Sequence, residues 1–185
     1  MKLRYLFAVT GLALASISAF AAHAATTPAA EPVKNIVLVH GLYADGSSWN
    51  KVIPLLQAKG LHVTAVQNPT TSLGDDVAAV KRALAQQNGP VILVAHSYGG
   101  MVISQAGDDA KVKGLVYIAA RAPDAGEDYV ALTKKFPPAP ASKGLKWQAD
   151  GYGELSESAF IHDFADAGDA DQRHAGQAGT GLPAD

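Results

Sequence analysis

Short runs of consecutive apolar residues alternate with helical patterns along most of the chain. Residues 36–39 read Ile-Val-Leu-Val, and such a run is typical of a strand whose two faces are both buried in a parallel sheet. The strands predicted in this way span residues 36–39, 61–66, 91–94 and 112–119. Because helical stretches separate them, we predict an α/β fold in which right-handed crossovers connect a mostly parallel sheet.

The segments between these strands carry signals for helices that would cover both faces of the sheet. The serines at residues 47–48 can cap a helix that restarts at Pro54. Ser72, with Asp75 three residues later, resembles a capping box. Behind it, apolar residues recur at helical spacing and form one stripe: Leu73, Val77, Val80 and Leu84. A further helix is predicted over residues 101–106.

The pattern changes after Pro123. Residues 124–146 contain three prolines and are predicted to be an irregular excursion. A helix follows, for which Ser156 supplies the cap. Leu155, before this cap, is expected to pack on Phe160 as in a hydrophobic staple.

These patterns divide the chain into consecutive parts. Residues 1–24 are predicted to be a signal peptide and residues 25–34 a disordered lead-in. Residues 35–167 form the α/β core, and within it residues 124–167 form a small cap segment. Residues 168–185 contain neither a strand nor an amphipathic pattern and are predicted to be an unstructured tail.

The N-terminus has the three regions of an export signal. Lys2 and Arg4 precede the uncharged residues 5–20, and Ala22-His23-Ala24 places small residues at a cleavage site. An uncleaved membrane anchor is the alternative, but the uncharged stretch is short for a membrane span. We therefore expect cleavage after Ala24, a secreted or periplasmic protein, and no membrane association after the cleavage.

Composition narrows the possible functions further. The chain has 185 residues, 17 acidic against 15 basic side chains, and no cysteine. One ordinary domain fits this length, and the charge balance lacks the clustered Lys and Arg that would favour nucleic-acid binding. Without cysteine, the chain has no disulfide, thiolate nucleophile or Cys–zinc site. The histidines are too scattered for a metal motif, so we expect neither a metal nor another cofactor.

The candidate nucleophile is Ser97. The strand at residues 91–94 runs through Ala95-His96-Ser97-Tyr98-Gly99-Gly100 directly into a helix. A serine on such a tight strand-to-helix turn adopts a strained backbone. Small residues must flank it so that the strand before the turn and the helix after it can pass close to each other. Ala95 and Gly99 satisfy this need. The turn would lift the hydroxyl of Ser97 above the carboxyl edge of the sheet, although a serine that only caps the helix is the simpler alternative.

A second motif follows the first predicted strand. His40-Gly41-Leu42 lies where a loop amide would complete an oxyanion hole, with the backbone amides of Leu42 and Tyr98 as the two donors. Gly41 would let the backbone approach the substrate. His40 is expected to brace this loop, and a role as catalytic base is the alternative.

These motifs together resemble the α/β-hydrolase superfamily. The similar stretches are IVLVHGLYADGSSWNKVIPLLQAKGLHVTAV, VILVAHSYGGMV and LVYIAARAPDAGED, and weaker similarity continues through DGYGELSESAFIHDFA. The chain is most similar to the small esterase branch that contains plant methylesterases and hydroxynitrile lyases. The resemblance implies an esterase in which Ser97 is the nucleophile and the cap segment shapes the pocket for a small ester.

The partners of a serine nucleophile are missing from the predicted elements. In this family the acid and then the histidine follow the nucleophile along the chain, after later strands. None of the histidines combines this order with a supporting scaffold: His23, His40, His62, His96, His162 and His174. Asp124, after the fourth predicted strand, is an alternative acid. The triad acid and histidine therefore stay unknown, and we expect a C-terminally incomplete chain whose last strands are missing, with one side of the sheet exposed.

Two hypotheses follow from these observations. The first is a carboxylesterase-type serine hydrolase that forms an acyl-enzyme at Ser97 and is impaired by truncation. The second is a non-catalytic protein of the same fold that binds a small hydrophobic ligand, or an inactive remnant. Neither the substrate nor the oligomeric state follows from the residues.

Overall fold

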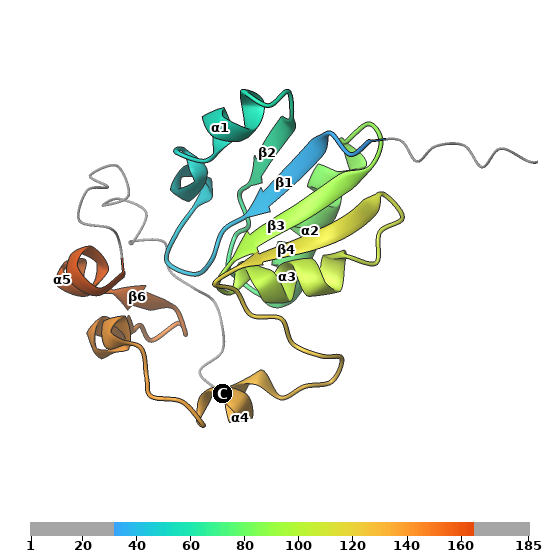
Figure 1. Cartoon of the computed structure of the whole chain (residues 1–185). Helices are drawn as coiled ribbons and strands as arrows, with labels where there is room; N and C mark the ends of the chain where they lie inside the picture. Colours follow the sequence, from blue (N-terminus) through green and yellow to red (C-terminus); the bar gives the residue numbers. More distant parts are fainter. Residues whose placement is uncertain (1–31, 165–185) are drawn as a thin grey trace, which may run out of the picture. The chain divides into compact units, whose positions relative to one another are not determined.

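The computed structural model describes residues 32–164, which form a parallel four-stranded sheet and a smaller group of elements beside it (Figure 1). The strands of the sheet are β1 (Asn35–Val39), β2 (His62–Val66), β3 (Val91–His96) and β4 (Val112–Ile118). Their order across the sheet is β2-β1-β3-β4, and every neighbouring pair is parallel. The α/β class predicted from the alternating apolar runs is confirmed.

Strands β1 and β3 occupy the centre of the sheet. All residues of β1 are buried, as an apolar strand with neighbours on both edges and layers on both faces requires. Val39 at the end of β1 is in register with Ala95 near the end of β3. The loops that follow these two strands therefore start side by side at the carboxyl edge of the sheet.

Two helices cover one face of the sheet. Helix α2 (Leu73–Ala85) and helix α3 (Gly99–Ala106) pack on β1 and β3 in the main hydrophobic core (Figure 1). The stripe predicted on α2 lies in this core, and Ser72 caps the helix by accepting a hydrogen bond from the amide of Asp75, 3.1 Å away. Here the local signals and the tertiary packing agree.

The opposite face is covered by two short elements, the 3-10 helix η1 (Gly46–Trp49) and the helix α1 (Ile53–Gln57). Pro54 lies in the first turn of α1, as the predicted restart requires. The predicted cap at residues 47–48 is wrong, because the carboxylate of Asp45 accepts the hydrogen bond from the amide of Ser47 at 2.7 Å. The carboxylate of the residue directly before η1 therefore fulfils the capping role.

Residues 124–164 of the cap segment lie beyond the carboxyl ends of the strands (Figure 1). Its elements are α4 (Tyr129–Thr133), η2 (Pro140–Gly144), β5 (Leu145–Trp147), β6 (Gly153–Leu155), α5 (Glu157–Ala159) and the π-helical turn η3 (Phe160–Phe164). The prediction of an irregular stretch over residues 124–146 is thus wrong in part, because α4, η2 and the start of β5 fall within it. Strand β5 depends on antiparallel pairing with β6, which no local pattern reveals.

The second half of the cap segment has a small core of its own. Ser156 caps α5 by accepting a hydrogen bond from the amide of Ala159, as predicted. Leu155 and Phe160 belong to one buried cluster, against which Tyr43 and Phe164 pack. Because Tyr43 belongs to the loop after β1, this cluster joins the cap segment to the sheet.

Strand β4 forms one edge of the sheet, and its face opposite α3 is partly open. Val116 and Ile118 are 44% and 43% exposed, while Leu115 and Tyr117 pack against the core on the helical side. Among residues 32–164, no helix is both long and apolar enough to cross a membrane. The predicted signal peptide, the tail, His23 and His174 lie outside the described residues.

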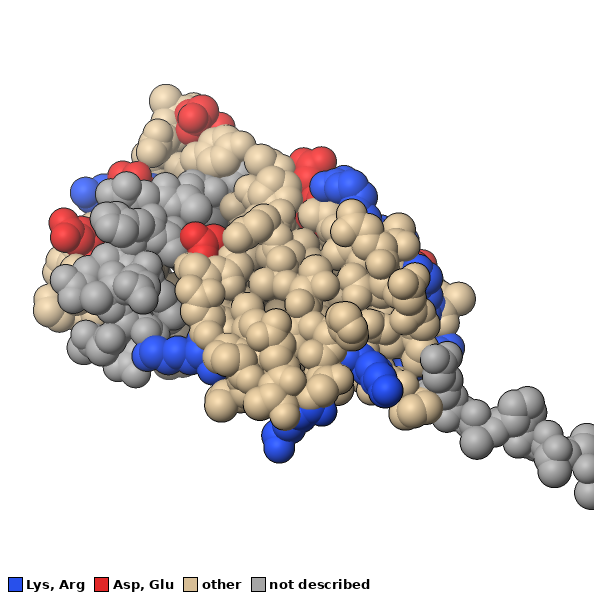
Figure 2. All heavy atoms as spheres, turned by 90° about the horizontal axis from the view of Figure 1, so that it is seen from above, with Lys and Arg blue, Asp and Glu red and all other residues tan. Residues whose placement is uncertain are grey.

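Charged side chains are dispersed on the face drawn in Figure 2. Basic and acidic groups are interspersed and lie mostly near the rim, and the centre of this face carries neither. The described residues on this face therefore form no basic patch of the kind that binds a phosphate backbone.

Candidate active site

The turn between β3 and α3 holds Ser97 in a strained conformation. Its φ angle is +52°, in the left-handed region that residues other than glycine rarely adopt. Ser97 is partly exposed, whereas Tyr98 after it and Ala95 before it are buried. Backbone strain of this kind is typical of functional sites and presents the serine hydroxyl at the carboxyl edge of the sheet.

Close backbone contacts explain the glycines after Ser97. A Cβ atom at Gly99 would lie 2.7 Å from the carbonyl oxygen of His40 and 2.8 Å from that of Val39. A Cβ atom at Gly100 would overlap the carbonyl group of Arg121. Only glycine lets helix α3 start this close to the ends of β1 and β4, so both glycines are needed for the position of the turn.

The loop after β1, residues 40–43, lies next to Ser97. A Cβ atom at Gly41 would lie 2.9 Å from Cβ and 3.4 Å from Oγ of Ser97. Gly41 therefore leaves open the space directly beside the serine hydroxyl. The two motifs identified in the sequence meet at this point, because they follow adjacent strands in register.

His40 is buried and both of its ring nitrogens are engaged. Nε2 lies 3.3 Å from the backbone amide of Asn68, which donates to it, and Nδ1 lies 2.9 Å from the carbonyl oxygen of Gly41. Burial lowers the pKa of His40 below its ordinary value, although its hydrogen bonds and nearby carboxylates oppose this shift. A neutral ring with a proton on Nδ1 satisfies both contacts. This ring holds the Gly41 carbonyl towards itself and so orients the Gly41–Leu42 peptide.

A buried hydrogen-bond network, which was not predicted from the sequence, connects the serine turn to helix α2. The hydroxyl of Tyr98 donates to Oδ2 of Asp76 at 2.7 Å, and the amide of Thr70 donates to Oδ1 at 2.7 Å. Burial raises the pKa of Asp76, against the effect of these hydrogen bonds, and burial together with Asp76 raises the pKa of Tyr98. One signal could have revealed the network, because Asp76 lies three residues after Leu73, on the apolar face of α2.

None of the other candidate residues in the described chain is hydrogen-bonded to Ser97, although His96 directly precedes it in the sequence. His62 lines a hollow at the amino edge of the sheet, and His162 is exposed on η3. Burial lowers the pKa of His96, the neighbour of Ser97. Asp124 is exposed and lines a separate hollow beside Met101, which it shares with Glu127. In residues 32–164, no group of three or more histidine and carboxylate side chains could hold a metal ion.

A hollow of about 580 Å³ lies between the loop after β1 and the cap segment. Most of its lining is apolar and includes Leu42, Tyr43, Tyr129, Phe136, Ala141, Leu145, Leu155 and Phe164. It reaches the serine turn at Leu42 and at Arg121, whose backbone amide donates to the carbonyl oxygen of Ser97 at 3.0 Å. Ser97 itself is not among the lining residues, so the hollow borders the serine turn only through these two residues.

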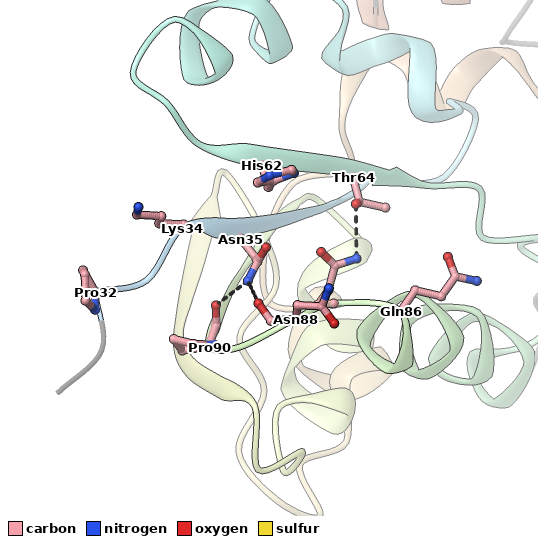
Figure 3. A pocket seen from close by; sticks show the side chains of 9 residues that line it. Pro32, Lys34, Asn35, His62, Thr64, Gln86, Asn88 and Pro90 are labelled. Atoms are coloured by element: carbon pink, nitrogen blue, oxygen red, sulfur yellow. Dashed lines mark hydrogen bonds between the residues drawn. The ribbon is translucent and has the colours of Figure 1, made fainter.

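A larger hollow, of about 720 Å³, lies at the opposite edge of the sheet (Figure 3). The side-chain amide of Asn35 donates to the carbonyl oxygens of Asn88 and Pro90, and the amide of Gln87 donates to Thr64. These polar groups thus hold the amino ends of the strands together. Because the hollow is at the amino edge, it does not border the serine turn.

Comparison with known proteins relates these features to one family. The sequence profile described as "Alpha/beta hydrolase family" matches residues 36–184. Methylesterase 7 of Arabidopsis thaliana is 36% identical over 107 residues, which are 49% of this chain and 41% of that protein. The alpha-hydroxynitrile lyase of the same plant is 34% identical over 105 residues, again 49% of this chain and 41% of that protein.

Solved structures give the same relationship. The crystal structure of a pyrethroid hydrolase superposes with a TM-score of 0.61 at 25% identity, covering 69% of this chain and 57% of that chain. The chain therefore spans about half the length of the relatives that it matches. The similarity to methylesterases and hydroxynitrile lyases that the motifs indicated is confirmed.

Proposed function

Since the chain belongs to the alpha/beta hydrolase family, we propose that it hydrolyses a small carboxylic ester through an acyl-enzyme at Ser97. The observation that carries this proposal is the strained turn. Ser97 has a φ angle of +52° between β3 and α3 and lies beside the open space at Gly41. A serine held in this way at the end of a parallel strand is suited to nucleophilic attack.

The reaction proceeds in two steps. Oγ of Ser97 attacks the carbonyl carbon of the ester, and its proton passes by way of a base to the departing alcohol oxygen. Water then attacks the resulting acyl-enzyme, which releases the acid and returns a proton to Ser97. We assign no residue between 32 and 164 as the base, because His40 uses both ring nitrogens in other contacts and no histidine of this range is hydrogen-bonded to Ser97.

The backbone amides of Leu42 and Tyr98 are proposed to bind the oxyanion that forms in both steps. Neither amide has a hydrogen-bond partner among the residues that the structure describes. The Gly41 carbonyl is turned towards His40, and in a trans peptide the Leu42 N–H points the opposite way. Two donors fixed before the reaction stabilise the developing charge without reorganisation.

The hollow under the cap segment is proposed to bind the substrate. Its apolar lining and its volume of about 580 Å³ suit a small, largely apolar ester. The sequence similarity to a methylesterase and the structural similarity to a pyrethroid hydrolase support ester hydrolysis. A ligand-binding protein without catalysis is the alternative, and it requires the same hollow but no reactive serine.

Labelling with a fluorophosphonate separates the two functions. We expect the full chain to be labelled and mass spectrometry to locate the label on Ser97. Ser97→Ala would then abolish labelling, whereas Ser142→Ala would retain it, because Ser142 lines the same hollow away from the turn. Absence of label on Ser97 in a folded chain would favour the non-catalytic protein.

We also propose that residues 1–24 direct export, with cleavage after Ala24. Expression in a bacterium followed by fractionation tests this proposal. N-terminal sequencing of the exported form should begin at Ala25, and an intact Met1 in the soluble cytoplasmic fraction would contradict it.

A further inference from the structure

One formal charge lies in the lining of the hollow under the cap segment. Among the described residues that line it, Arg121 alone is charged, and no carboxylate faces it there. The other lining side chains are apolar or carry uncharged hydroxyls. A ligand in this hollow therefore meets a single positive charge in surroundings that are otherwise of low polarity.

The backbone holds Arg121 at a fixed place beside the serine turn. Its amide donates to the carbonyl oxygen of Ser97 at 3.0 Å, and its carbonyl group packs against Gly100. Arg121 follows β4 closely, so the end of this strand determines where its side chain starts. These backbone contacts therefore fix the position from which the Arg121 side chain starts relative to Ser97.

The guanidinium of Arg121 has no carboxylate partner in residues 32–164. Its Cζ atom lies 4.1 Å from the ring centre of Tyr129, and Nη1 lies 3.9 Å from Sδ of Met101. The ring covers one face of the guanidinium plane, and a thioether sulfur is only a weak acceptor. Since a guanidinium has five N–H donors along its edges, most of its capacity to bind an anion is unused.

We propose that the hollow selects esters that also carry a carboxylate, which Arg121 binds while the apolar part of the molecule fills the remaining space. This inference rests on the proposed function and names its substrate class. Arginine is suited to the role, because its planar fork matches the two oxygens of a carboxylate. The contact with Tyr129 holds the side chain in place and so reduces the entropy lost on binding.

A purely structural role for Arg121 predicts a different behaviour. In that case the cation–π contact with Tyr129 would only fasten α4 to the sheet. Loss of Arg121 would then weaken every ligand of the hollow equally, and so would loss of the Tyr129 ring. An anion-binding role changes the ratio between a charged ligand and its neutral analogue.

Binding to the Ser97→Ala chain tests the proposal without any need for catalysis. Phenylacetate and phenylacetamide have nearly the same shape but differ in charge, and calorimetric or NMR titration gives the affinity of each. We expect phenylacetate to bind about tenfold more tightly or better. Arg121→Met should bring the ratio close to one, while Arg121→Lys and Tyr129→Leu should keep a preference for the anion.

Arg82→Met is the matched control, because Arg82 is exposed on α2 and its loss removes a positive charge elsewhere. It should leave the ratio unchanged, and circular dichroism should show that every variant is folded. An equal affinity for both ligands, equal weakening of both by Arg121→Met, or no binding of either ligand would overturn the proposal. Because the Ser97→Ala chain lacks the serine hydroxyl, a negative binding result does not bear on the labelling of Ser97 in the wild type.

Discussion

The hydroxyl of Tyr98 donates a hydrogen bond of 2.7 Å to Oδ2 of Asp76, which anchors the residue after Ser97 to helix α2. Both side chains are buried, at 1% and 0% exposure. The position of the serine turn therefore depends on a helix that precedes it by more than ten residues in the chain.

Tyr98→Phe should destabilise the protein by about 1.5–3 kcal/mol, since it leaves a buried carboxyl group with one donor fewer. Urea unfolding followed by tryptophan fluorescence measures the change, because Trp49 is buried in the folded chain. Tyr152→Phe is the control, because the Tyr152 hydroxyl has no partner within the described chain. Equal midpoints for the two variants would contradict the importance of this contact.

Gly41→Ala should reduce labelling of Ser97 by about tenfold or more while the fold is kept. The added Cβ would lie 2.9 Å from Cβ of Ser97, so one of the two backbones has to shift by a few tenths of an ångström. A displacement of the reacting groups by about 1 Å can lower the rate by about a hundredfold. Gly74→Ala is the control, because its Cβ would meet nothing closer than 3.8 Å. Unchanged labelling kinetics in Gly41→Ala would argue against a site at this loop.

Gly100→Ala should destabilise the protein by about 1–3 kcal/mol, the cost of inserting a methyl group where none fits. The Cβ would overlap the carbonyl group of Arg121, and backbone cannot rotate away as a side chain can. Comparison of thermal midpoints with those of the wild type and Gly74→Ala measures the effect. A midpoint as high as that of Gly74→Ala would show that α3 can start further from the end of β4.

The stabilising effect of His40 should depend on pH. Burial lowers its pKa in the folded chain below the ordinary value of 6.5, so the unfolded chain takes up the proton first as the pH falls. The contribution of neutral His40 is therefore complete well above pH 6.5 and is lost as the pH falls below it.

Urea unfolding of the wild type and of His40→Asn between pH 8 and pH 5 isolates this contribution. The difference in unfolding free energy should be about 1–2 kcal/mol at pH 8 and should shrink below pH 6.5. The comparison is made as a difference because the pKa of His96 is also lowered by burial, and this effect, which does not involve His40, cancels in it. A difference that stays constant over this range would contradict a buried neutral His40.

The sequence alone determined the features that depend on neighbours in the chain. An uninterrupted apolar run such as residues 36–39 favours a strand that is buried on both faces, whichever segments later pack against it. The same holds for the turn at Ser97, since its strain and its small neighbours are properties of six consecutive residues. The similarity of the two motifs to a known family followed from these local patterns.

Only the tertiary structure decided the contacts between distant segments. Asp76 and Tyr98 lie 22 residues apart and meet because α2 and α3 share one face of the sheet. Arg121 and Tyr129 line one hollow and contact each other because the end of β4 and the cap segment come together there. No periodicity encodes such pairs, because each depends on the path of the whole chain and not on the preferences of one segment.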